Sequence, residues 1–179
     1  ALVIGDVTLG AVQGADLVVI AVKPQHMRQA AESLAPFVDP SPVVMTIAAG
    51  IRVGDLSRWL AGCPRIVRAM PNTPALVGAG ISGVFAPIDV NMASRKLAGR
   101  VLESVGAVIW VEREDMLDAI TGISGSGPAY AFYFLEALED AARELGMTDE
   151  NARKLAYATF AGAIKLAQAK HKRRVDPGR

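Results

Sequence analysis

The sequence lacks several features that identify membrane, secreted and metal-binding proteins. Cys63 is the only cysteine, so no internal disulfide can form and a reducing cytoplasm is the expected compartment. The two histidines, His26 and His171, have no cysteine or histidine neighbours at the spacing of metal ligands. Hydrophobic residues make up 51% of the chain, but charged residues interrupt every apolar run well short of a bilayer span. We therefore predict no metal site and no membrane segment.

An excess of either charge is also missing. The formal net charge is +1, and the basic residues are scattered along the chain up to about residue 170. Nucleic-acid-binding proteins usually gather lysine and arginine on one surface, so we expect no nucleic acid as the main partner. Neither a G-x-S-x-G motif nor a Ser/His/Asp arrangement is visible, and no residue is an evident general acid. We therefore leave the catalytic residues unassigned.

The first part of the chain alternates short apolar runs with amphipathic segments. Runs this uniformly apolar and rich in β-branched residues predict strands covered on both faces, as in a parallel sheet. Strands that alternate with helices predict βαβ units with right-handed crossovers. The predicted strands are 17–22, 43–47, 66–70, 81–85 and 107–111, and the predicted helices are 24–37, 53–62 and 89–106.

The second part carries no strand pattern after Glu114. Pro128 suits the first turn of a helix that runs to about Leu145, and Gly146 suits its C-terminal end. Thr148 is a suitable N-cap for a second helix. Small and apolar residues occur on several faces of both helices, and two helices cannot cover one another on every side. We therefore expect a second copy of the chain to pack against them.

Three predicted strands end in segments that suit a ligand. In open parallel sheets, ligands bind beyond the carboxyl ends of the strands. The segments are "AVKPQ" (21–25), "TIAAGI" (46–51) and "RAMPNTPALVGAG" (68–80). A solvated lysine, a tight turn without a ligand, and an ordinary Asx turn explain the three segments about as well.

A fourth segment, "TGISGSGPAY" (121–130), places three glycines directly before a predicted helix. A helix start with free backbone N–H groups attracts anions. A flexible hinge between the two parts of the chain is the alternative.

Taken together, these segments resemble the pyrroline-5-carboxylate reductase family. The resemblance rests on the segments "GADLVVIAVKPQ", "TIAAGI", "RIVRAMPNTPALVGAG", "SVGAVIWVEREDMLDAITGISGSGPAYAF" and "ATFAGA", in this order, and it covers roughly residues 14–168. "AMPNTP" together with "SGSGPAY" is the most specific combination. The family implies an α/β fold: a Rossmann-like nucleotide-binding domain, here 1–113, followed by an all-α dimerisation and substrate domain, here 114–179.

The resemblance also implies an activity, a cofactor and a set of site residues. The family reduces 1-pyrroline-5-carboxylate to L-proline with NADPH or NADH, the last step of proline synthesis, and it forms homodimers through the C-terminal helices. The implied cofactor-binding residues are Val22, Lys23, Pro24, Ala48, Ala49, Gly50 and Asn72. The implied substrate-binding residues are Asn72, Thr73, Pro74, Ser124, Gly125, Ser126 and Gly127.

Two segments of the family pattern are missing. The N-terminal glycine-rich phosphate loop is absent, and so is the C-terminal "TSPGGTT"-like stretch that contacts the substrate. We expect an incomplete chain that lacks the first βαβ portion of the nucleotide-binding domain and the end of the helical domain. An inactive fragment, a non-catalytic dimerising module of the family, and another reductase resembling 6-phosphogluconate dehydrogenase are the alternatives.

Overall fold

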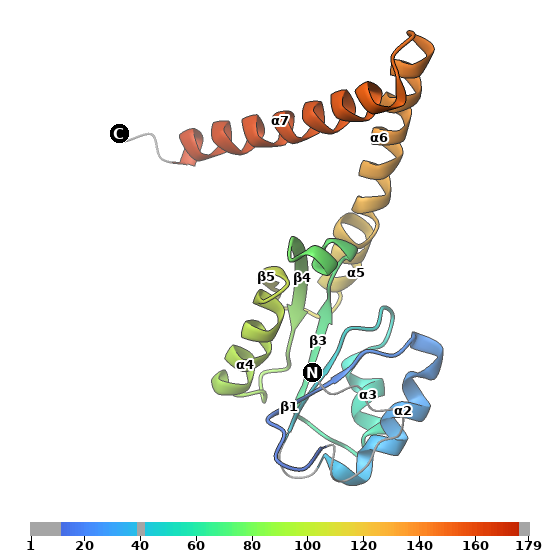
Figure 1. Cartoon of the computed structure of the whole chain (residues 1–179). Coiled ribbons are helices and arrows are strands. Elements are labelled where there is room, and N and C mark those ends of the chain that lie inside the picture. Colours follow the sequence, from blue (N-terminus) through green and yellow to red (C-terminus); the bar gives the residue numbers. More distant parts are fainter. Residues whose placement is uncertain (1–11, 39–41, 176–179) are drawn as a thin grey trace. The chain divides into compact units, whose positions relative to one another are not determined.

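The computed structural model describes residues 12–38 and 42–175, with side chains up to residue 169, and the chain divides into two compact units. Unit 1 extends to Pro128, and unit 2 begins at Ala129 (Figure 1).

A five-stranded sheet forms the centre of unit 1. Its strands follow one another in the order β1-β2-β3-β4-β5, and each nearly coincides with one of the predicted apolar runs. Their bounds are β1 (Leu17–Ile20), β2 (Val43–Thr46), β3 (Ile66–Met70), β4 (Gly80–Phe85) and β5 (Gly106–Trp110). The sheet is therefore the α/β arrangement that the sequence predicts.

Two strands, β4 and β5, run opposite to the other three, which differs from the prediction of a parallel sheet. β1, β2 and β3 are parallel, and so are β4 and β5, but β3 and β4 run antiparallel, with Met70 opposite Gly83. The connection between β3 and β4 contains only the short 3-10 helix η3 (Thr73–Val77). A parallel crossover needs a dozen or more residues, usually with a helix, whereas a short connection joins antiparallel strands.

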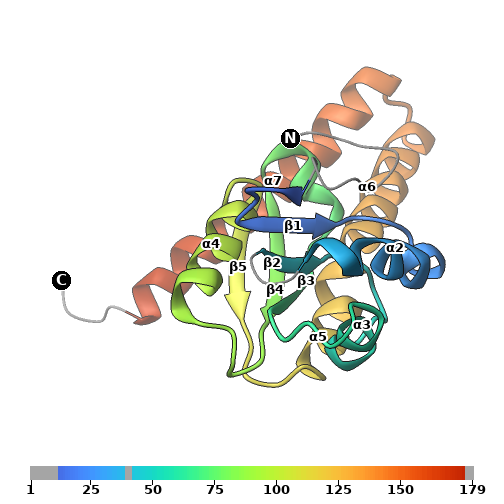
Figure 2. The ribbon, with the colours of Figure 1, turned by 90° about the horizontal axis from the view of Figure 1, so that it is seen from below.

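Helices cover both faces of the sheet, as Figures 1 and 2 show. On one face lie η1 (Pro24–His26), α2 (Met27–Leu34), η2 (Ala35–Phe37) and α3 (Val53–Trp59), and on the other lies α4 (Met92–Glu103). Alternate residues of a strand point to opposite faces, so Val44 and Ile66 belong to the first core, while Met45 and Val67 belong to the second. Unit 1 thus has two apolar cores, one on each side of the sheet.

A helical segment closes unit 1. α5 (Met116–Ile120) continues without a break into the π-helical turn η4 (Thr121–Gly125), and α6 (Gly127–Glu144) begins two residues later. α5 lies against the sheet at Gly83, where an added Cβ would come within 2.4 Å of Ile120 Cδ1. Glycine at this position allows the helix to approach β4 closely.

Unit 2 consists of the remainder of α6 and of α7 (Asp149–Val175), as the sequence predicts. Gly146 ends α6 with a left-handed backbone (φ 90°), and Met147 donates a backbone hydrogen bond to Ala142. Arg143 ties the two helices together, because it donates hydrogen bonds to Glu139, Asp140 and Asp149. The hydrogen bond to Asp149 raises the pKa of the Arg143 guanidinium above its usual value.

The helices of unit 2 leave most of their large apolar side chains exposed. The aromatic rings of Phe134 and Phe160 lie 6.4 Å apart, yet Phe134 is 60% exposed. Among the apolar residues of α6 and of α7 up to residue 169, the buried ones are small: Ala142, Ala152 and Ala156. Among the described residues, no helix combines the length and the apolar character that crossing a membrane requires.

Candidate functional site

The ends of three strands bring the predicted ligand segments to one edge of the sheet. β1, β2 and β3 are parallel, so their carboxyl ends share an edge. Lys23 follows β1, Ala49 and Gly50 follow β2, and Asn72 follows β3. This edge is the place where an open α/β sheet binds its ligands.

The first two segments present an open surface at this edge. Val22, Lys23 and Pro24 are exposed. After β2, Ala49 and Gly50 are exposed, and a Cβ added at Gly50 would meet nothing within 4 Å. Ala48 differs from these two, because it is buried in the first core, and its backbone N–H donates to Thr46 Oγ1 over 3.2 Å. The turn at residues 49 and 50 therefore offers backbone rather than side chain to a ligand.

Asn72 joins the third segment to the fourth. Its Oδ1 accepts a hydrogen bond from the backbone N–H of Ile81 over 2.9 Å, and its Nδ2 donates to the backbone oxygen of Ser124 over 3.2 Å. The sequence predicts an amide that projects from the rim of the site, whereas both ends of this amide are already bound within the chain. Its neighbour Thr73 is exposed, and Pro74 is half-buried. The structure thus brings Asn72 and Ser124 together, although 52 residues separate them.

The glycine-rich segment forms a π-helical turn, Thr121–Gly125, directly before α6. Ser126 donates its backbone N–H to the oxygen of Thr121, the five-residue spacing of a π turn, over 3.1 Å. The prediction of a helix start with free N–H groups is therefore wrong at Ser126. Ser124, Gly125, Ser126 and Gly127 are all half-buried, and among residues 12–38 and 42–169 the buried Ser124 Oγ finds no hydrogen-bond partner. A Cβ at Gly125 would lie 3.2 Å from Met70 Cε, so this glycine lets the turn approach β3.

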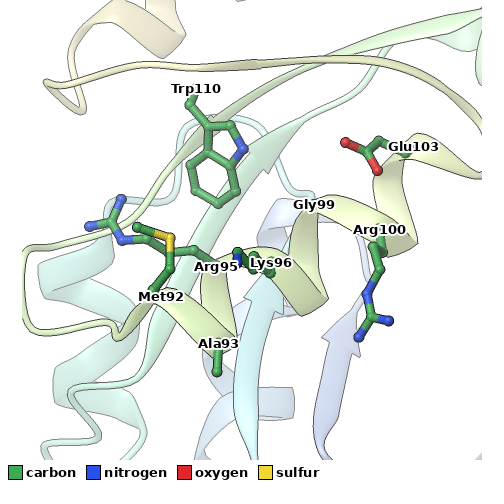
Figure 3. Close-up of a pocket in the computed structure, with 8 residues that line it drawn as sticks. All are labelled: Met92, Ala93, Arg95, Lys96, Gly99, Arg100, Glu103 and Trp110. Atoms are coloured by element: carbon green, nitrogen blue, oxygen red, sulfur yellow. The ribbon is translucent and has the colours of Figure 1, made fainter.

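A hollow of about 810 Å³ lies elsewhere in unit 1, between α4 and Trp110. Figure 3 shows Trp110 above the helix, with Met92 and Arg95 close to it. The guanidinium of Arg95 lies 5.8 Å from the centre of the Trp110 ring. Residues of α4 and Trp110 at the end of β5 line this hollow, and Lys23, Gly50 and Asn72 are not among its lining residues. The hollow is therefore separate from the candidate site.

Comparisons with known proteins show which proteins this chain resembles. Residues 114–177 match the family model described as "Pyrroline-5-carboxylate reductase dimerisation". The chain is 45% identical over 158 residues to the pyrroline-5-carboxylate reductase of Pseudomonas aeruginosa, an alignment that covers 88% of this chain and 58% of that protein. Over the part that it spans, the chain is similar in sequence to pyrroline-5-carboxylate reductases.

Solved structures of pyrroline-5-carboxylate reductases are also similar to this chain. The pyrroline-5-carboxylate reductase of Coxiella burnetii is 42% identical, with a TM-score of 0.82 over 89% of this chain and 59% of that one. The enzyme of Plasmodium falciparum, solved with NADP bound, is 32% identical, with a TM-score of 0.76 over 84% of this chain and 59% of that one. This chain spans less than two thirds of the length of these relatives.

The structure contains a cluster of charged residues around Arg68 that was not predicted from the sequence. Arg68, inside the apolar strand β3, is only 2% exposed and pairs with Glu114 over 3.0 Å. The signal was present, because an arginine within the run "IVRAM" needs a carboxylate partner if the strand is buried. The partner, Glu114, follows 46 residues later in the chain. The sequence pattern does not show that these two residues meet in the fold.

Proposed function

We propose that this protein reduces 1-pyrroline-5-carboxylate to L-proline with NADPH or NADH. The similarity to pyrroline-5-carboxylate reductases over 88% of the chain carries this proposal. A hydride adds to the ring carbon of the C=N bond and a proton adds to the nitrogen, while the reduced nicotinamide is oxidised. These additions convert the cyclic imine to the secondary amine of proline.

The edge of the sheet that bears Lys23, Ala49 and Gly50 fits a nicotinamide cofactor, which supplies the hydride when it is bound. The exposed backbone at residues 49 and 50 leaves room for a flat ring or a ribose, since no side chain larger than a methyl group occupies it. Lys23 places a positive charge beside this turn, where a phosphate would lie. The proposed cofactor-binding residues are Val22, Lys23, Pro24, Ala48, Ala49, Gly50 and Asn72.

The turn that follows α5 supplies the proposed substrate surface. Ser124 Oγ is a buried polar group without a hydrogen-bond partner in the described part of the chain, and a ligand's polar atom would satisfy it. Asn72 holds this turn through the backbone oxygen of Ser124, which fixes the position of the hydroxyl. The proposed substrate-binding residues are Asn72, Thr73, Pro74, Ser124, Gly125, Ser126 and Gly127. They would orient the imine and exclude water from it.

A homodimer through the C-terminal helices is part of the same proposal. Phe132, Tyr133 and Phe134 are each at least 60% exposed, and a second copy of α6 and α7 would cover them. We keep the division into a nucleotide-binding part, 1–113, and a helical part for dimerisation and substrate, 114–179, because the matched family model begins at residue 114. The lone, buried Cys63 suits a cytoplasmic location.

The proposal is tested by supplying the full-length protein with reduced nicotinamide and a set of substrates. We expect oxidation of NADPH or NADH only when 1-pyrroline-5-carboxylate is present, with L-proline as the product. Steady turnover of a 2-hydroxy acid, with none of the cyclic imine, would show that the protein is another kind of reductase. Binding of the cofactor without any turnover would favour a non-catalytic module.

A further inference from the structure

The buried guanidinium of Arg68 lies at the centre of a four-residue ion-pair cluster. Arg68 Nη1 donates to Glu114 Oε1 over 3.0 Å, and Arg68 Nη2 lies 3.7 Å from Asp118 Oδ1. A buried charge is costly unless it is paired and hydrogen-bonded. Glu114 is itself mostly shielded, with its side chain 22% exposed, whereas Asp118 is more than half exposed. The pair between Arg68 and Glu114 is therefore the buried part of the cluster.

The same carboxylates hold the segment that follows β2. Glu114 Oε1 accepts a second hydrogen bond, from the backbone N–H of Val53 over 2.8 Å, and so caps the N-terminus of α3. Arg52 Nη2 donates to Asp118 Oδ2 over 2.6 Å. The cluster thus connects three segments: the start of α3, the strand β3, and the segment 114–118.

Two of these segments continue directly into the candidate site. The start of α3 follows the exposed turn at Ala49 and Gly50, and α5 leads into the turn that contains Ser124. The cluster therefore lies where the proposed cofactor surface and the proposed substrate surface are joined.

β3 contacts the helical segment at regular two-residue intervals. Side chains two residues apart on an extended chain point to the same side. Arg68 pairs with Glu114, Met70 lies against Gly125, and Asn72, which is still extended, bonds to Ser124. One side of this strand thus contacts both ends of the segment 114–125.

We propose that Arg68 is a positioning residue for the imine reduction proposed above, on which this inference rests. Through Glu114 and Asp118 it fixes α5 and the turn at Ser124 relative to the turn at Ala49 and Gly50. A purely stabilising role would not need a charge, since a buried ion pair can often be replaced by apolar residues without loss of stability. The charge is kept because its directional bonds set the geometry of the two surfaces.

The test compares variants of the full-length protein. Arg68→Lys keeps the charge but loses the planar two-pronged donor. Arg68→Met removes the charge, and Arg68→Met combined with Glu114→Leu replaces the buried pair by apolar side chains. Arg65→Met is the matched control, because Arg65 precedes β3 at its other end and donates to the backbone oxygen of Val38. For each variant we measure the thermal unfolding midpoint, kcat/KM for the imine, and amide hydrogen exchange in residues 48–53 and 119–128.

We expect the double variant to unfold near the midpoint of the unmutated protein, yet to show kcat/KM lower by about tenfold or more, the effect of losing a charged hydrogen bond. Exchange in residues 119–128 should be faster in this variant and in Arg68→Lys, and unchanged in Arg65→Met. Recovery of activity together with stability in the double variant would overturn the proposal. So would an Arg68→Lys variant with unchanged kcat/KM and unchanged exchange.

Failure of the proposed role of Arg68 can be distinguished from failure of the proposed function. If the unmutated protein does not reduce the imine, the proposed function fails, and the exchange measurement alone decides the role of Arg68. Faster exchange confined to residues 48–53 and 119–128 would still support positioning. Unchanged exchange in both segments would reject it. If Arg68→Met does not fold, Arg68→Lys and the double variant give the same comparison.

Discussion

Unit 1 buries many large apolar side chains in cores on both faces of the sheet, although Leu76, Val77 and Ile88 are exposed, whereas in unit 2 most of the large ones lie on the surface. Met45, Leu56 and Val67 in unit 1 are at most 1% exposed, while Tyr133 and Phe132 of α6 are more than 60% exposed. A large exposed apolar surface usually marks an interaction site. The comparison shows that unit 1 has apolar cores of its own, whereas the helices of unit 2 bury little of their large apolar surface, which supports the proposed dimer.

The largest expected effect follows from placing a charge on the exposed helices of unit 2. Ala161→Glu on α7 would bury an unpaired carboxylate against the second copy, at a cost of about 3–5 kcal/mol. We expect the dimer to dissociate, as measured by sedimentation velocity. Ala93→Glu makes the same substitution at an exposed position of α4 and serves as the control. A dimer of Ala161→Glu with unchanged affinity would remove this face from the interface.

A smaller effect is expected from a methyl group added within the sheet of unit 1. Gly106 begins β5 with φ 149°, and an added Cβ would lie 2.0 Å from the backbone oxygen of Gly80 on the neighbouring strand. Gly106→Ala should lower the free energy of unfolding by about 3 kcal/mol, measured by chemical denaturation.

Gly122→Ala is the control for this substitution, because a Cβ there meets nothing within 4 Å. It should leave the stability unchanged or raise it, since alanine favours helices over glycine by about 1 kcal/mol. Equal losses of stability in both variants would contradict the packing between β4 and β5.

The smallest effect concerns the edge of the sheet and leaves both units folded. Lys23→Ala should raise the KM for the cofactor about tenfold, the effect of losing one charged contact, with little change in the KM for the imine. Lys96→Ala removes another exposed lysine of unit 1, on α4, and should change neither value. An unchanged KM for the cofactor in Lys23→Ala would leave this lysine as a solvated strand-end residue.

The sequence predicted the strands well because their signal is local. Runs such as "VVMTI" and "IVRAM" are apolar and β-branched along their length, and β2 and β3 lie within them. The direction of β4 was not predicted, because the pattern of a strand is the same in both directions. The short connection through η3 indicates an antiparallel pair, because it is too short for a parallel crossover. Connection length is therefore the observation that would have corrected the parallel assignment.

The candidate site was predicted in part, for a related reason. Lys23, Gly50 and Asn72 each follow a strand, and strand order brings them to one edge. The bond from Asn72 to Ser124 and the pair between Arg68 and Glu114 cross long stretches of sequence, so no periodicity shows them. The π turn at Ser124 was not predicted either, because its five-residue hydrogen bond leaves no sequence signal.

The proposed reaction is tested most directly by following the transferred hydrogen. The full-length protein is incubated with 1-pyrroline-5-carboxylate and reduced nicotinamide that carries deuterium at the position of the transferred hydride, and the product is examined by NMR. The account predicts L-proline with deuterium on the ring carbon that was doubly bonded to nitrogen. Proline without deuterium at that carbon, or no proline despite oxidation of the cofactor, would contradict it.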